Sequence, residues 1–528
     1  MPASSSIVVE KNVPSVMRDG TTLHADVYRP AEGGPWPVLL QRTPYNKGFV
    51  GNPFQMLDPL RAAEAGYAVV IQDCRGRFTS EGEFYTFRDE SADGYDTIEW
   101  AAAQPWSNGR VGMYGASYVG ATQWLAALAK PPHLQAICPL ITASDYHEGW
   151  AYQGGALELG FAESWITGGL ALPNFGRLAR AHGFGGADRQ ALIEAVDGLC
   201  DIFRYLPLKD FPPLKRPGLA DYFYDWIDHP DDDEYWQRWS IERRHHELDL
   251  PAFHVGGWYD IFLLGTLRNY TGLRVNAPTD RARRGQKLLI GPWHHGIPLT
   301  NLVGRHNFGV MSMALAIDLD GRQLRWFDYW LKDEPNGILD EPPVRIFVMG
   351  ENVWRDEQEW PLARTEYVDY HLRSGGRANT RMGDGWLSPE PPGADEPFDA
   401  YLYDPRDPTP TLGGGLCCSP AAVPGGAFDQ GEIEDRSDVL VYSTPPLDRP
   451  VEITGPVEVV LHAASSAPDT DWTAKLVDVA PDGYARNLTD GILRTRYRES
   501  KSTPKLIEPG RVYRYTIDLV ATSNVFLP

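Results

Sequence analysis

Short apolar runs alternate with amphipathic stretches over the first quarter of the chain. Strand-length apolar runs, such as those of buried parallel strands, cover residues 38–41, 68–72, 111–114 and 134–141. Between them, residues 56–65 and 89–103 carry apolar side chains at helical spacing. A hairpin is predicted over residues 7–30, with its turn at residues 18–20. Alternating strands and helices predict an α/β fold built on a doubly wound sheet.

Two changes in this pattern divide the chain. Residues 145–245 are rich in Trp, Tyr and helix-compatible stretches such as 187–201, which predicts a helical insertion. Strand patterns return at 251–257 and 287–291, and a helix is predicted over 314–331. Beyond residue 356, strand-length segments at 366–372, 438–443, 456–463 and 473–479 predict an all-β, jelly-roll-like domain. The expected division is therefore an α/β core in two parts, 1–144 and 246–355, a helical cap at 145–245, and a β domain at 356–528.

Composition narrows the class of protein. With 528 residues, 42% hydrophobic residues and 17 tryptophans, the chain is expected to fold into several globular domains. A formal net charge of −22 argues against nucleic acid as a partner. Neither a secretion signal nor an apolar run of roughly 18 residues is visible, so we expect a cytoplasmic protein that does not span a membrane.

The cysteines argue against a disulfide framework or a zinc site. The chain has five, an odd number, and none forms a C-x-x-C pair. Cys417 and Cys418 are neighbours in sequence, which makes a bond between them strained. Neither a metal nor an organic cofactor is expected.

The candidate chemistry centres on a serine in a tight turn. Residues 115–120 read Gly-Ala-Ser-Tyr-Val-Gly, between a strand-like segment and a helix-like one. This is the context of a nucleophile elbow, in which a serine stands between a strand and a helix at the edge of the sheet. Small residues at 115, 116 and 120 allow the sharp turn that lifts Ser117 into a cleft.

A serine nucleophile needs a base and an acid that orients the base. In an α/β-hydrolase these follow later strands, in the order acid and then histidine. Asp260 follows the strand predicted at 251–257, and His294 and His295 follow the strand at 287–291. Spacing alone leaves the choice between the two histidines open.

Several motifs give the whole chain a resemblance to a known family. The chain resembles the cocaine esterase/X-Pro dipeptidyl-peptidase-type hydrolases, in the right order and nearly from end to end. The matching segments are 73–78 (DCRGRF), 80–84 (SEGEF), 96–100 (DTIEW), 112–118 (GMYGASY), 257–260 (GWYD), 291–295 (GPWHH), 410–414 (PTLGG) and 467–476 (APDTDWTAKL).

The resemblance implies roles that spacing does not. It selects His295 as the base and places His294 behind it or at the surface. It implies an oxyanion hole made by the amide of Tyr118 and the hydroxyl of Tyr45, which stands in residues 42–47 (RTPYNK). It also implies an acyl pocket lined by Gln55, Trp150, Trp165 and Phe262.

The predicted function is hydrolysis of a small-molecule carboxylic ester by Ser117, His295 and Asp260, with amides as a possible second class. Three alternatives stay open: an α-amino acid ester hydrolase, an X-Pro dipeptidyl peptidase, or a binding protein on a hydrolase fold. Glu148 and Glu158 lie near the region where amino ester hydrolases hold the substrate ammonium, but no set of three carboxylates is evident. Relatives continue beyond residue 528. If the sheet lacks its last strands, we expect an exposed edge and a homo-oligomer, which light scattering would detect.

Overall fold

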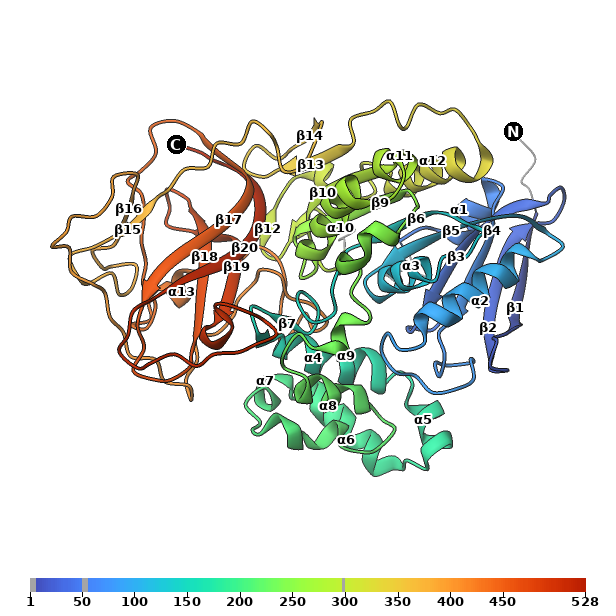
Figure 1. Cartoon of the computed structure of the whole chain (residues 1–528), viewed down its shortest axis with the longest axis horizontal. Helices are drawn as coiled ribbons and strands as arrows, with labels where there is room; N and C mark the ends of the chain where they lie inside the picture. The colour runs from blue at the N-terminus through green and yellow to red at the C-terminus, as the bar shows by residue number, and fades with distance from the viewer. Residues whose placement is uncertain (1–5, 50–55, 297–299) are drawn as a thin grey trace.

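A ten-stranded mixed sheet forms the centre of the molecule (Figure 1). The computed structural model describes residues 6–49, 56–296 and 300–528. The strand order is β1-β2-β4-β3-β5-β6-β9-β10-β13-β14. The strands are β1 (Ile7–Val16), β2 (Thr22–Pro30), β3 (Trp36–Thr43), β4 (Ala68–Asp73), β5 (Ser107–Ala116), β6 (Leu134–Leu140), β9 (Ala252–Tyr259), β10 (Gln286–His294), β13 (Val344–Val348) and β14 (Val353–Glu357).

The sheet is parallel in its centre and antiparallel at both edges. From β4 to β13 each neighbouring pair of strands is parallel, whereas β1, β2 and β14 run antiparallel to their neighbours. Helices α2 (Glu90–Ala102) and α3 (Tyr118–Leu128) cover one face, and α1 (Pro59–Glu64) and α12 (Leu319–Lys332) cover the other. Central strands are therefore buried on both faces, which explains their continuous apolar runs. This confirms the predicted α/β-hydrolase class.

Capping shortens two predicted helices at their starts. The helix expected over 314–331 begins at Leu319, because the Asp318 side chain accepts a hydrogen bond from the amide of Gly321. Likewise α1 begins at Pro59, with the Asp58 side chain accepting from the amide of Leu60. An acidic N-cap satisfies amides that have no partner within the helix, so it fixes the starting point.

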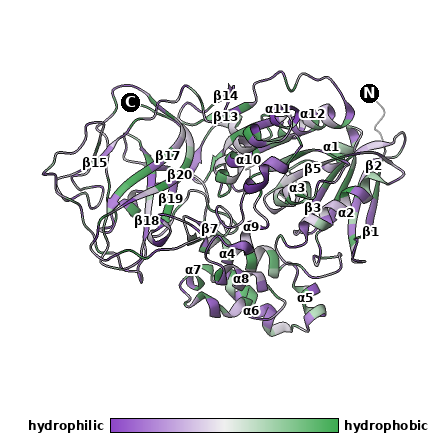
Figure 2. Cartoon of the chain, viewed as in Figure 1, coloured by the Kyte–Doolittle hydropathy of each residue, from purple (hydrophilic) through white to green (hydrophobic). Residues whose placement is uncertain are grey.

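A helical layer is inserted between β6 and β9. It holds the short strands β7 (Tyr152–Gln153) and β8 (Ala156–Leu157), the helices α4 (Leu159–Ser164), α5 (Phe175–His182), α6 (Gly186–Asp197), α7 (Leu199–Ile202), α8 (Asp221–Asp228) and α9 (Glu234–Gln237), and the π-helix η1 (Trp165–Ala171). These helices carry both hydrophobic and hydrophilic residues in Figure 2, as amphipathic helices do. Within the described ranges, none of the helices has the length and apolarity to cross a membrane.

The last third of the chain is β-rich and lies beside the sheet and the helical layer (Figure 1). Its longest strands pair antiparallel, β17 (Val451–Ala463) with β20 (Tyr513–Phe526) and β18 (Asp471–Val479) with β19 (Ala485–Arg494). A cavity of about 4000 Å³ lies among these strands and the loops around them.

Of the strands predicted in this region, one is wrong and another is too long. Residues 438–443 form no strand. They make only isolated bridges, at Leu440 to Asn379 and at Ser443 to Trp386. Of residues 366–372, only the last two enter a strand, β15 (His371–Arg373), which pairs with β16 (Trp386–Ser388). Alternating polarity produces a strand only where a continuous partner is present, and these segments lack one among the described residues.

Candidate active site

Ser117 occupies a strained turn between β5 and α3. Its backbone has φ 61° and ψ −127°, in a region that non-glycine residues rarely adopt. The two glycines of the motif make this turn possible. Gly115 has φ 125°, and a Cβ atom at Gly120 would lie 2.7 Å from the Cβ of Thr142. The serine is thus held above the N-terminus of α3, where the helix dipole favours negative charge.

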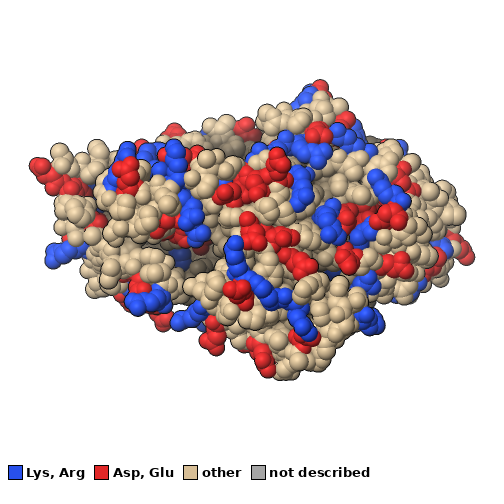
Figure 3. Space-filling model, turned by 60° about the horizontal axis from the view of Figure 1, so that its bottom comes forward, with Lys and Arg blue, Asp and Glu red and all other residues tan. Residues whose placement is uncertain are grey.

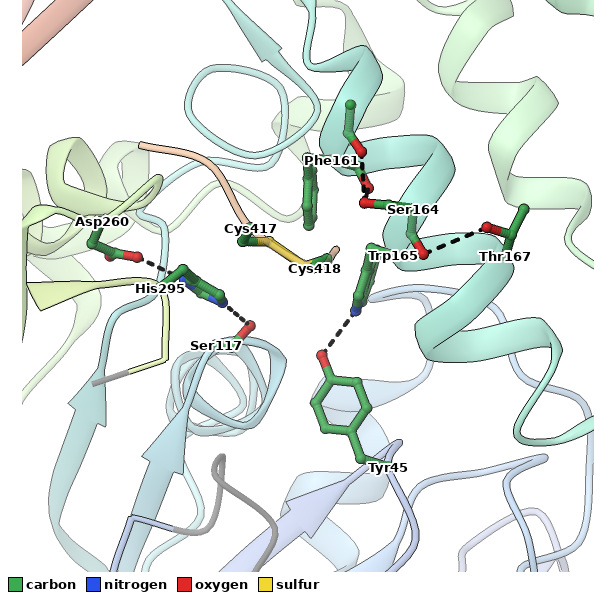
Figure 4. Close-up of a disulfide and its surroundings, with 11 residues drawn as sticks. Tyr45, Ser117, Phe161, Ser164, Trp165, Thr167, Asp260, His295, Cys417 and Cys418 are labelled. Atoms are coloured by element: carbon green, nitrogen blue, oxygen red, sulfur yellow. Dashed lines mark hydrogen bonds and ion pairs between the residues drawn. A yellow bond between two sulfur atoms is a disulfide. The ribbon is translucent and has the colours of Figure 1, made fainter. Parts of the chain in front are cut away.

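Three side chains meet at the carboxyl edge of the parallel strands, where α/β folds place their ligands. Asp260 follows β9 and His295 follows β10. Oδ1 of Asp260 accepts a hydrogen bond from Nδ1 of His295 at 2.6 Å, and Nε2 of His295 lies 2.9 Å from Oγ of Ser117 (Figure 4). A carboxylate only accepts, so Nδ1 carries the ring proton and Nε2 is left to accept from the serine. All three side chains are buried. This geometry can deprotonate the serine as it attacks a carbonyl.

Tyr45 lies on the side of Ser117 away from His295 (Figure 4). Its hydroxyl accepts a hydrogen bond from Nε1 of Trp165 at 2.9 Å (Figure 4). Burial raises the pKa of Tyr45, and hydrogen bonds to Trp165 and Ser117 partly offset the rise. The phenol therefore stays protonated. Trp165 uses the phenol oxygen as an acceptor, so this hydrogen bond does not involve the hydroxyl proton.

Aromatic rings surround the triad and Tyr45. Phe262 lies edge-on to His295 at 5.0 Å between ring centroids and stacks on Trp150 at 4.3 Å. Trp150 in turn meets Trp165 at 5.6 Å. The structure thus brings three of the four expected pocket residues together, while Gln55 lies outside the described residues. His294 packs against Gly425 and Gly296, and burial lowers its pKa.

Comparison with known proteins is consistent with this geometry. The sequence profile of the X-Pro dipeptidyl-peptidase (S15) family matches residues 19–297. This chain belongs to that family. The profile of the X-Pro dipeptidyl-peptidase C-terminal non-catalytic domain matches residues 336–528.

Individual known proteins are similar to this chain over almost its whole length. A cocaine esterase of Rhodococcus sp. is 43% identical over 531 residues, which cover 98% of this chain and 89% of the relative. A solved α-amino acid ester hydrolase is 26% identical with a TM-score of 0.78, covering 100% of this chain and 88% of that one. A solved aminopeptidase from a marine sediment archaeon gives the same TM-score of 0.78 at 26% identity, covering 99% of this chain and 87% of that one.

Sequence reasoning missed the buried charges that hold the residue after the serine. The Tyr118 hydroxyl donates to Glu90 at 3.0 Å, and Glu90 pairs with Arg42 at 2.6 Å. The Arg42 side chain is fully buried and that of Glu90 is 5% exposed. Burial raises the pKa of Glu90, and the Arg42 charge opposes the rise. This chain of contacts fixes the start of α3 and with it the Tyr118 amide.

Replacing Arg42 with alanine is expected to lower the free energy of unfolding by about 3–5 kcal/mol, because it leaves the Glu90 carboxyl buried without its cation. Chemical denaturation measures this loss. Arg18→Ala is the matched control, since Arg18 pairs with Asp96 at the surface and an exposed pair contributes about 0–1 kcal/mol. Equal losses in the two variants would contradict this role of the buried pair.

Arg77 was also missed, although it lies in one of the matching motifs. Its Nε donates to the Pro44 carbonyl at 2.7 Å, and its NH1 donates to the Leu170 carbonyl at 2.9 Å. Pro44 precedes Tyr45, and Leu170 lies in η1, the π-helix that begins with Trp165. One buried guanidinium therefore links the two segments whose side chains meet at the Tyr45 hydroxyl.

The cysteine prediction is wrong in one respect. Cys417 and Cys418 form a disulfide with their Cα atoms 3.8 Å apart. Adjacent residues are held near each other by the peptide that joins them, so the link needs no wider framework. Cys74, Cys138 and Cys200 are free cysteines.

Proposed function

We propose that the chain is a serine hydrolase that cleaves carboxylic esters through an acyl-enzyme. The observation that carries the proposal is the hydrogen-bonded series Asp260–His295–Ser117 at a nucleophile elbow. Ser117 attacks the ester carbonyl while His295 takes its proton and returns it to the leaving alcohol. Asp260 holds the imidazole tautomer and stabilises the imidazolium. Water, activated by His295, then releases the acid.

The oxyanion of the tetrahedral intermediate is stabilised by two donors, the Tyr118 amide and the Tyr45 hydroxyl. The amide is the first of helix α3 and benefits from its dipole. The phenol accepts a hydrogen bond from Trp165, which does not use the hydroxyl proton, and in this proposal that proton is donated to the oxyanion. Trp150, Trp165 and Phe262 provide an aromatic wall for the acyl group, and Gln55 stays a prediction from the family resemblance.

Tyr45→Phe is expected to lower kcat by about 10²–10³-fold with little change in KM, because the lost hydrogen bond forms only in the transition state. Steady-state hydrolysis of 4-nitrophenyl butyrate measures both constants. Tyr114→Phe is the control, since the Tyr114 hydroxyl is buried and makes no hydrogen bond with the described residues. An unchanged kcat in Tyr45→Phe would remove this residue from the oxyanion hole.

The site favours a plain ester over an amino ester. Glu148 is paired with Lys501, which neutralises its charge. Burial, with Asp490 and Glu148 nearby, raises the pKa of Glu158 to about 8, so this carboxyl is largely protonated at neutral pH. Neither group offers a free negative charge to a substrate ammonium.

A panel of three substrates tests this choice. We expect 4-nitrophenyl butyrate to be hydrolysed with a kcat/KM at least about tenfold above that for phenylglycine methyl ester, and Gly-Pro-anilide to be the poorest of the three. A preference for phenylglycine methyl ester would favour the amino ester alternative, and a preference for Gly-Pro-anilide the dipeptidyl peptidase alternative.

The partner in this proposal is a small molecule. Acidic and basic side chains are interspersed on the face shown in Figure 3, without the basic stripe that nucleic acid requires. The proposed division keeps the core in residues 1–144 and 246–355, the cap in 145–245 and the β domain in 356–528. In this division the cap supplies Trp150 and Trp165 to the site. A cytoplasmic location and a homo-oligomer stay predictions from the sequence.

A further inference from the structure

A loop from the β-rich part of the chain reaches the catalytic strands. It is closed at its base by two backbone hydrogen bonds between Gly414 and Gly426, of 2.7 and 2.9 Å. Its flanks lie directly against the triad segments. A Cβ atom at Gly415 would lie 3.5 Å from the carbonyl oxygen of Asp260, and one at Gly425 would lie 3.4 Å from the Cβ of His294. The two ends of this loop therefore pack against the residues that carry the catalytic acid and precede the catalytic histidine.

The Cys417–Cys418 disulfide lies in this loop, three residues beyond Gly414. In Figure 4 it lies between the His295–Ser117 pair and the rings of Phe161 and Trp165. Cys417 is buried in the same hydrophobic cluster as those two rings. Cys418 is exposed, and its φ of 80° is one that non-glycine residues rarely adopt. Cys417 is thus the buried half of the disulfide, packed with the aromatic rings, and Cys418 is the exposed half.

We propose that this disulfide is a reducible element of the active site, and that its redox state sets the preference for bulky acyl groups. The proposal rests on the proposed esterase function. Thiol–disulfide exchange requires access to one sulfur, and Cys418 is the exposed half of the disulfide. A thiolate of an external dithiol attacks the Cys418 sulfur, and the S–S bond breaks as Cys417 leaves and takes a proton. The second thiol of the reductant then displaces Cys418, so the cysteine pair gains two hydrogens and the dithiol is oxidised to its disulfide.

Reduction removes the covalent constraint on the loop but none of the triad's hydrogen bonds. Cys418 is then free to leave its left-handed backbone conformation, and the buried Cys417 side chain gains rotational freedom beside Phe161 and Trp165. The aromatic wall that faces the acyl group then no longer has a fixed disulfide packed beside it. A small acetyl group makes little use of that surface, whereas an aromatic acyl group depends on it, so the two substrates should respond differently.

The test compares 4-nitrophenyl benzoate with 4-nitrophenyl acetate before and after treatment with dithiothreitol. Intact mass spectrometry and thiol titration verify the state of the cysteine pair. We expect reduction to lower the benzoate-to-acetate ratio of kcat/KM by about tenfold or more, the effect of losing a small apolar contact in a pocket. The double variant Cys417→Ser/Cys418→Ser should show the reduced ratio and no response to the reductant. Cys200→Ser, which removes an exposed free thiol, should keep the full response.

Two results would overturn the proposal. One is an unchanged ratio in protein whose cysteine pair is shown to be reduced. The other is two free thiols at these positions after incubation with oxidised glutathione. Labelling of Ser117 by a fluorophosphonate is expected in both redox states. It distinguishes failure of the proposed redox role from failure of the proposed esterase function. Labelling with an unchanged ratio rejects the redox role alone, whereas absence of labelling in both states rejects the esterase function beneath it.

Discussion

Ser117→Ala is expected to lower kcat for 4-nitrophenyl butyrate by about 10⁶-fold, with the folded structure retained. The loss is this large because Ser117 forms the covalent bond with the acyl group, and its Oγ is the hydroxyl that lies 2.9 Å from Nε2 of His295. Residual hydrolysis then depends on the oxyanion donors and on binding alone. Adding His295→Ala to the variant should cost little more, because a triad acts as a unit.

The matched control is Ser15→Ala, which removes another buried serine hydroxyl, in β1 and far from the site in the fold. It should keep kcat within about twofold of the parent, as expected for a change outside the site. Substantial turnover by Ser117→Ala, verified by mass spectrometry to be free of parent enzyme, is incompatible with the proposed mechanism.

Asp260→Asn should have the second largest effect, a fall in kcat of about 10⁴-fold. The asparagine amide would donate toward Nδ1 of His295, where the carboxylate accepts at 2.6 Å in the parent. The ring proton then moves to Nε2, and the histidine can no longer accept the proton of Ser117. Because side-chain size is unchanged, KM should change little.

Steady-state kinetics and chemical denaturation together test this variant. Its free energy of unfolding should stay close to that of the parent, and Asp333→Asn, at an exposed carboxylate, should leave both measurements unchanged. If the variant lost activity only in proportion to lost stability, Asp260 would be a structural residue and the orienting acid would have to be sought elsewhere.

The position of Ser117 and Asp260 could be predicted from the sequence because each follows a strand whose apolar run is continuous. The parallel order of β5, β9 and β10 brings the ends of these strands to one edge, so residues distant in sequence meet. The roles of His295 and Tyr45 could not be predicted from spacing alone. Adjacent histidines point in different directions for reasons of local backbone, which no spacing rule records, and the family resemblance was needed to choose between them.

Other parts of the site depend on contacts between distant segments, which the sequence does not reveal. The Trp165–Tyr45 hydrogen bond joins the cap to the loop after β3, and the Arg42–Glu90 pair lies beneath Tyr118. Both require the tertiary fold before they can be seen. The sequence argued against a Cys417–Cys418 bond because neighbouring cysteines form a strained disulfide, but the peptide that joins them also keeps them close enough to bond.

Covalent labelling tests the central claim, that Ser117 is the nucleophile, most directly. A fluorophosphonate should add one equivalent per chain and abolish esterase activity in parallel, and peptide mapping should place the adduct on Ser117. Ser117→Ala should not be labelled. An unlabelled, active enzyme, or an adduct on another residue that accounts for the inhibition, would contradict the account.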